Sequence, residues 1–229
     1  MFHPLCGAEI AAKLHEHGYH AGLQLPSGAV SQLRRHAEES FCTTGQGSRE
    51  TFLIGDVQAG RLPSGSPVAI ADVDLMDCTV AADVAGDPTL VDIVRRFFGY
   101  MPARVAVRLY WSPCSTLSDD ERRWNGQTID YHYDIERGYA VYVFFYLSDT
   151  DRHAGAHAVV AGSHSPKPLR LRLASTRQPE KAVLGHYGAD KVVVLEGKAG
   201  FGFLEDPACF HRALPPTAAP RLMLQLRYS

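Results

Sequence analysis

The chain has 229 residues, of which 45% are hydrophobic, and this is enough apolar material to build one substantial core. Lys and Arg number 23 against 25 Asp and Glu, so the formal charge is only −2, and without a basic run this argues against nucleic acid or an anionic membrane as partner. Five widely spaced cysteines without a C-x-x-C motif argue against a disulfide framework or a zinc knuckle.

The apolar runs are all shorter than the roughly 20 residues of a membrane span, and the N-terminus lacks the basic and then apolar pattern of a signal peptide. We therefore expect one soluble, cytoplasmic domain over residues 1–229 that acts on a small molecule. Helical support and loops are expected in 1–100 and a β core in 101–229. The oligomeric state is not predicted.

The first hundred residues show helical spacing in three places. Residues 9–17 read as a helix that stops at Gly18, and a short strand is expected over 19–25. Ser27 is the expected N-cap of a second helix that ends at Glu39, and Asp87-Pro88 begins a third that ends at Phe98. Residues 43–66 are rich in Gly, Ser and Thr and are expected to form a loop that closes over a cleft.

The strand expected over 103–111 carries a charged residue, Arg108, either directed into a cleft or placed at an edge or surface. It is followed by a polar stretch over 112–127, which is interpreted either as a solvated connection or as a lid, because it ends only a few residues before His132.

The stretch Asp130-Tyr131-His132-Tyr133-Asp134 contains an H-x-D motif. In an extended segment, side chains two residues apart point to the same face, so His132 and Asp134 can hold neighbouring positions on one metal ion. A second match, His36-Ala37-Glu38, falls in a predicted helix, where residues two apart are turned roughly 200° from one another and cannot share a metal.

Beyond this motif, short apolar runs predict strands over 141–147, 156–161, 191–196 and 201–204. The first has bulky residues on both faces and is expected to be buried on both. His164 follows the second, in a turn, and is assigned a structural role with its imidazole bonded to the backbone. The basic segment 169–188 either binds an acidic substrate or forms a surface excursion.

The last strand separates the C-terminal arginines by parity. Arg221, Met223, Gln225 and Arg227 share one face, and Leu222, Leu224, Leu226 and Tyr228 share the other, which is expected to pack under helices. Arg212 adjoins His211 and points away from it, while Arg227 lies roughly 20 Å beyond Arg221 along the strand. Arg221 is therefore the arginine expected beside a metal held by His132, Asp134 and His211.

Two histidines and one carboxylate on one face of an octahedral ion are the arrangement of non-haem Fe(II) oxygenases. A nearby arginine can then bind the far end of a dicarboxylate co-substrate. Short, evenly spaced strands after residue 100 predict an antiparallel barrel or jelly roll, the double-stranded β-helix, backed by the N-terminal helices. In that fold His211 is expected on a strand that faces the one carrying His132.

These motifs together resemble the phytanoyl-CoA dioxygenase family of iron- and 2-oxoglutarate-dependent oxygenases. The resemblance rests on His132-x-Asp134, on Gly155-Ala-His-Ala-Val-Val-Ala-Gly-Ser-His164, on His211 and on Arg221, and on the opening His17-Gly18-Tyr19. It implies that Fe(II) and O2 are used and that Arg221 binds the far carboxylate of 2-oxoglutarate. It also implies hydroxylation of a metabolite with release of succinate and CO2. Asp134 speaks against a halogenating variant.

The sequence departs from the family pattern at Ala161, where a proline is usual, and at Ala213, where some relatives place a serine on the co-substrate. A cupin-like zinc or manganese protein that binds or isomerises a small molecule is the alternative, but it has no need of Arg221. The substrate pocket is expected to be lined by Tyr133, Tyr142 and the loops over 43–66 and 112–127.

Overall fold

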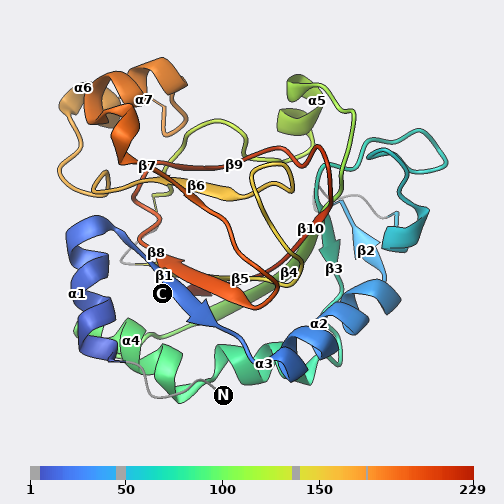
Figure 1. The fold of residues 1–229 in the computed structure, drawn as a ribbon, viewed down its shortest axis with the longest axis horizontal. Coiled ribbons are helices and arrows are strands. Elements are labelled where there is room, and N and C mark those ends of the chain that lie inside the picture. Colours follow the sequence, from blue (N-terminus) through green and yellow to red (C-terminus); the bar gives the residue numbers. More distant parts are fainter. Residues whose placement is uncertain (1–5, 45–49, 136–139, 174) are drawn as a thin grey trace.

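The structure is a computed structural model, and it describes residues 6–44, 50–135, 140–173 and 175–229 (Figure 1). Within these residues, a sheet of seven strands in the order β1-β8-β5-β10-β4-β3-β2 and a sheet of three strands in the order β7-β6-β9 form the two layers of a β-sandwich. The predicted jelly-roll architecture is confirmed. The two sheets of the described chain do not, however, join into a closed barrel.

The larger sheet draws on both halves of the chain. Its strands are β1 (Tyr19–Gln24), β2 (Cys42–Thr43), β3 (Ala71–Val73), β4 (Val105–Ser112), β5 (Val141–Tyr146), β8 (Phe201–Glu205) and β10 (Arg221–Tyr228). The smaller sheet consists of β6 (His157–Val160), β7 (Val192–Leu195) and β9 (His211–Ala213). The first hundred residues therefore contribute β1, β2 and β3 to the larger sheet in addition to helices and loops.

Helices cover the outer face of the larger sheet and the far side of the smaller one (Figure 1). The first group is α1 (Gly7–His17), α2 (Ser27–Glu39), α3 (Thr79–Ala85) and α4 (Pro88–Phe98), and the second is α5 (Asp119–Trp124), α6 (Leu169–Leu173) and α7 (Glu180–Tyr187). Short 3-10 turns occur at Ile54–Asp56 and Ala189–Lys191. Among the described residues, the helices are all too short or too polar to cross a bilayer.

Helix α4 forms for reasons that the sequence makes plain. Its N-cap, Asp87, accepts a hydrogen bond from the Thr89 backbone N–H, and Pro88 occupies the first turn, where its missing N–H costs nothing. The helix ends at Gly99, which adopts the left-handed conformation with φ 78°. The predicted cap of α2 is wrong, because Ser27 is already helical and Pro26 takes the N-cap position without a side-chain bond.

Strand β10 separates the side chains that face the helices from those that face the interior of the sandwich. It pairs with β4 and β5, and its residues Leu222, Leu224 and Leu226 are fully buried in the outer core beneath the helices. Met223 lies in the inner cluster between the sheets. The predicted parity of this strand is confirmed, so Arg221 is turned towards the interior of the sandwich.

The described residues of the basic segment over 169–188 include two short helices. Its helices α6 and α7 bury Leu171 and Val183 in a small cluster with Tyr131 and Phe210. Glu180 at the start of α7 pairs with Arg212, with Oε1 and Nη2 3.1 Å apart. The helices thus pack beside the segment that carries His132.

Candidate metal centre

His132 and His211 lie next to each other on neighbouring backbone segments. The His132 N–H donates to the His211 carbonyl at 3.0 Å, and the His211 N–H donates to the His132 carbonyl at 2.8 Å. Two details of the prediction are therefore wrong. Residues 130–134 form an isolated bridge rather than a regular strand, and His211 is a lateral neighbour of His132 rather than a residue of a facing strand. Strand β9 pairs with β6 along one side, and the bridge places His132 along its other side.

His132, Asp134 and His211 form a group whose ligand atoms all lie within 4.8 Å of one another. Both imidazoles are buried, and Asp134 is half-buried. Nδ1 of His132 lies 3.1 Å from the Asp130 carbonyl, and Nδ1 of His211 lies 2.9 Å from the Cys209 carbonyl. A carbonyl only accepts, so each Nδ1 carries the proton and each Nε2 keeps a lone pair for a metal.

The surroundings of the three side chains favour metal binding in two further ways. Burial lowers the pKa of His211 to about 4, so this imidazole is uncharged at neutral pH, as a metal ligand must be. The Tyr142 hydroxyl donates a hydrogen bond to Asp134 Oδ2 at 2.9 Å and so orients the carboxylate. Oδ1 of Asp134 then lies 4.0 Å from His132 Nε2, a separation that one shared ion can span.

Arg221 is fully buried at the inner end of the same chamber. Its Nη1 donates to the Gly155 carbonyl at 2.5 Å and its Nη2 to Ser112 Oγ at 3.1 Å, while its Nε has no partner among the described residues. In the described part of the chain this guanidinium makes no ion pair with a carboxylate. A buried charge without a counter-ion is costly, so an anion bound beside this guanidinium would be stabilised.

The other arginines are placed differently. Arg212 points away from the chamber and pairs with Glu180, as predicted from its position beside His211. Arg108 and Arg227 reach the outer part of the chamber, where Arg108 pairs with Asp72 at 2.5 Å and Arg227 lies over the Tyr142 ring at 5.0 Å. Arg108 thus faces the chamber from β4, which is not an edge strand.

The chamber has a volume of about 390 Å³ and contains His132, Asp134, His211 and Arg221 in its lining. Tyr142 also lines it, as do Gly126 and Gln127 from the end of the polar stretch over 112–127. The described residues of the loop over 43–66 do not line this chamber. Residues 45–49 of that loop lie outside the part of the chain that the structure describes.

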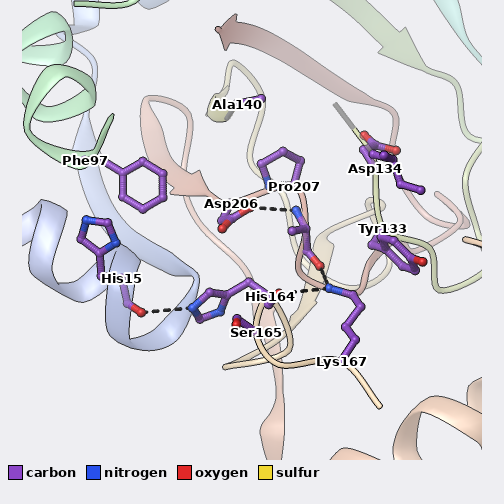
Figure 2. A pocket seen from close by; sticks show the side chains of 12 residues that line it. His15, Phe97, Tyr133, Asp134, Ala140, His164, Ser165, Lys167, Asp206 and Pro207 are labelled. Atoms are coloured by element: carbon purple, nitrogen blue, oxygen red, sulfur yellow. Dashed lines mark hydrogen bonds between the residues drawn. The ribbon is translucent and has the colours of Figure 1, made fainter. Parts of the chain in front are cut away.

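A second cavity of about 560 Å³ opens on the other side of Asp134 (Figure 2). Tyr133 lines this cavity rather than the metal chamber, and its ring lies 4.6 Å below the Lys167 ammonium group. His164 is also here, with Nε2 3.1 Å from the His15 carbonyl. His164 is therefore bonded to the backbone, as expected, although the carbonyl belongs to α1 and not to its own turn.

A buried pair beside the candidate metal ligands, His157 and Glu205, was not predicted from the sequence. Nε2 of His157 lies 2.7 Å from Glu205 Oε2, and both side chains are almost completely inaccessible. Burial raises the pKa of Glu205 to about 7 and lowers that of His157 to about 3. The alternation of side chains along each strand could have indicated that both residues face the interior. It could not have shown that two residues so far apart in sequence are in contact.

The donor set matches ferrous iron better than the other common protein metals. Two imidazole nitrogens and one carboxylate oxygen, with an open chamber on the remaining side, form the facial triad of non-haem iron enzymes. The thiol groups of Cys42 and Cys209 are buried elsewhere and do not belong to this group.

Comparison with protein families and solved structures agrees with this geometry. The family model for phytanoyl-CoA dioxygenase (PhyH) matches residues 24–223. The structure of EctD from S. alaskensis with 2-oxoglutarate and 5-hydroxyectoine superposes with a TM-score of 0.67 at 20% identity, covering 97% of this chain and 75% of that one. A comparison with curated proteins gave no significant match.

Two further structures share the fold. The epimerase SnoN, in complex with Fe3+, alpha ketoglutarate and nogalamycin RO, has a TM-score of 0.65 at 18% identity, covering 97% of this chain and 82% of that one. HygX from Streptomyces hygroscopicus, with nickel, 2-oxoglutarate and hygromycin B bound, has a TM-score of 0.62 at 17% identity, covering 96% and 86%.

Fold and site together define an oxygenase-type enzyme that depends on iron and 2-oxoglutarate. Because the family model spans most of its length, the chain belongs to the phytanoyl-CoA dioxygenase (PhyH) family.

Proposed function

We propose that this protein oxidises a small organic molecule in the chamber beside His132, Asp134 and His211, in the simplest case by hydroxylation. Substrate, O2 and 2-oxoglutarate are consumed, and hydroxylated product, succinate and CO2 are released, so that one oxygen atom enters each organic product. The observation that carries the proposal is the buried guanidinium of Arg221, which lacks a carboxylate partner in the described chain and shares a chamber with the three candidate ligands.

In this proposal, Nε2 of His132, the Asp134 carboxylate and Nε2 of His211 hold the iron. When bound there, ferrous iron supplies the activation of O2 and the oxidative decarboxylation of the 2-oxo acid. Arg221 binds the far carboxylate of 2-oxoglutarate through its planar fork of donors. Tyr142 keeps the Asp134 carboxylate in one orientation through its hydrogen bond of 2.9 Å.

The outer part of the chamber is the proposed place for the substrate. Tyr142 and Phe144 give it an aromatic wall, and both belong to the inner face of β5. Tyr133 lines the neighbouring cavity, so a direct role in substrate binding is proposed for Tyr142 and not for Tyr133. Solved structures of this fold include an epimerase and a carbocyclase, and product analysis therefore decides which oxidative outcome this chain produces.

The decisive experiment is anaerobic addition of Fe(II) and then 2-oxoglutarate, with detection of the visible charge-transfer band that a 2-oxo acid gives when it chelates ferrous iron. We expect a band in the unmodified protein, none in His132→Ala, and a band that needs much more 2-oxoglutarate in Arg221→Ala. Arg212→Ala is the matched control, because Arg212 points away from the chamber. Metal binding without any band would favour a cupin-like zinc or manganese protein instead.

A further inference from the structure

His157 occupies the wall of the chamber between the candidate metal ligands and Arg221. Its strand, β6, begins beside Gly155, whose carbonyl accepts the 2.5 Å hydrogen bond from Arg221 Nη1. Further along β6, Val159 pairs directly with His211. His157 lies midway between these positions, and its ring is stacked on the His211 ring with centroids 5.4 Å apart. A dicarboxylate that runs from the metal to Arg221 therefore passes alongside His157.

Ala213, the cross-strand neighbour of His157, contributes no polar group beside it. His157 and Ala213 are direct cross-strand partners in the smaller sheet, and both line the chamber. Side chains of such a pair stand on the same face of the sheet. Ala213 has only a methyl group, so His157 is the member of this pair that can form a hydrogen bond. The aromatic rings of Phe144 and Phe203 pack against the imidazole at 5.3 Å and 5.2 Å and hold its plane.

Glu205 restricts the rotation of the His157 ring through a hydrogen bond. It lies at the end of β8, is completely buried, and places Oε2 2.7 Å from His157 Nε2. Nδ1 of His157 makes no hydrogen bond within the described residues, so Nε2 is held by Glu205 and Nδ1 is left for a ligand. A carboxylate only accepts hydrogen bonds, so a dicarboxylate bound at Nδ1 requires the ring proton on Nδ1, and Nε2 then accepts from the Glu205 carboxyl group.

We propose that His157 is a co-substrate-binding residue that donates a hydrogen bond from Nδ1 to 2-oxoglutarate, and that Glu205 is the positioning residue that fixes the His157 ring. This inference rests on the proposed function, because it concerns the same co-substrate in the same chamber. It adds a second donor to the single arginine that the sequence indicated.

The test measures the dissociation constant of 2-oxoglutarate in two ways. The first is anaerobic titration of the charge-transfer band in Fe(II)-loaded protein, and the second is calorimetric titration of the Ni(II)-loaded protein, which requires no turnover. We expect His157→Leu to raise the dissociation constant about tenfold, which corresponds to about 1.4 kcal/mol. His157→Gln retains an N–H donor and is expected to stay within about threefold of the unmodified protein.

Variants of Glu205 separate positioning from simple packing. Glu205→Gln keeps a donor to His157 Nε2 and should preserve the affinity for 2-oxoglutarate, whereas Glu205→Leu should weaken it several-fold. The double variant His157→Phe with Glu205→Leu removes both polar partners and fills their space with apolar groups, which protects the fold. It should bind 2-oxoglutarate as weakly as His157→Leu. Metal affinity, measured separately, should be unchanged in His157→Leu and His157→Gln, whereas the Glu205 variants are compared only after metal loading is verified, because Glu205 Oε1 also lies 3.7 Å from His211 Nδ1.

The outcomes are distinguishable. If His157→Leu and the double variant bind 2-oxoglutarate as tightly as the unmodified protein, His157 does not bind the co-substrate and the proposal is overturned. A loss of metal affinity in His157→Leu would also overturn it, because His157 would then act on His211 or on the metal. If the unmodified protein gives neither a band nor a calorimetric signal with 2-oxoglutarate, the proposed function itself fails, independently of His157.

Discussion

His132 and His211 exchange both of their backbone hydrogen bonds, at 3.0 Å and 2.8 Å, and their rings lie 4.2 Å apart at an angle of 61°. Such a hydrogen-bonded antiparallel pair fixes two residues opposite each other with their side chains on the same face. The relative position of the two imidazoles is therefore set by the backbone. Asp134 follows two residues later and is oriented by Tyr142.

Removal of either histidine should abolish tight metal binding. Loss of a partner that only orients a ligand typically costs about 10- to 100-fold in affinity, so loss of a ligand itself should exceed about 100-fold. We expect this for His132→Ala and for His211→Ala in titrations with Fe(II) or Co(II) under anaerobic conditions. His164→Ala is the control, because its imidazole bonds to the His15 carbonyl and lines the neighbouring cavity. Tight stoichiometric binding by His211→Ala would contradict the assignment.

Arg221→Lys should weaken 2-oxoglutarate binding even though the positive charge is kept. The ammonium group cannot present two parallel donors to a carboxylate, and it cannot also satisfy the Gly155 carbonyl and Ser112 Oγ that the guanidinium contacts. We expect the dissociation constant of 2-oxoglutarate to rise at least about tenfold with metal affinity unchanged. Arg212→Lys provides the comparison, and an equal effect of both substitutions would show that Arg221 has no special role.

Tyr142→Phe tests the hydrogen bond to the carboxylate ligand. The variant loses the 2.9 Å contact to Asp134 Oδ2 but keeps the aromatic wall of the chamber. Metal affinity should fall about 10- to 100-fold. In Tyr228→Phe, the lost hydroxyl bonds to the Ala85 carbonyl on the outer face, so stability alone should decrease, by about 1 kcal/mol. Unchanged metal affinity in Tyr142→Phe would rule out the orienting role.

Leu224→Ala should destabilise the fold by about 2 to 5 kcal/mol, because it opens a cavity beneath the helices in the middle of β10. Denaturant unfolding measures this change. Leu173→Ala, at a side chain that is 78% exposed in α6, should shift stability by less than about 0.5 kcal/mol. Similar losses in the two variants would mean that the outer face of β10 does not carry the main core.

The stability contribution of Glu121 should disappear in acid. Hydrogen bonds from the Ser118 backbone and from Arg61 lower the pKa of Glu121 from its ordinary 4.5 to about 2. Above pH 4.5 the carboxylate is charged in both states and stabilises the native one. As the pH falls from 4.5 towards 2, the unfolded chain takes up a proton first, so this contribution is lost. The difference in unfolding free energy between the unmodified protein and Glu121→Gln should therefore be largest above about pH 5 and vanish near about pH 2. A difference independent of pH would exclude this origin.

Local pattern determined which residues face the interior of this protein. The alternation in β10 separates Arg221 from Leu222, and the capped, amphipathic run from Asp87 to Gly99 forms α4 as predicted. These features depend on the fixed periods of strands and helices, so the sequence carries them residue by residue. The pairing of His132 with Asp134 and the choice of Arg221 rest on the same alternation, whereas His211 was chosen from its place at the end of an apolar run and from the resemblance to the family.

Tertiary structure alone decided which of these residues meet. His132 joins His211 laterally at the edge of the smaller sheet, Tyr133 turns into a separate cavity, and Glu205 on β8 reaches His157 on β6. Each contact depends on strand order and register, which result from packing across the whole core and leave no periodic trace in the chain. For that reason the ligands and Arg221 could be named from the sequence, whereas the buried pair between them could not.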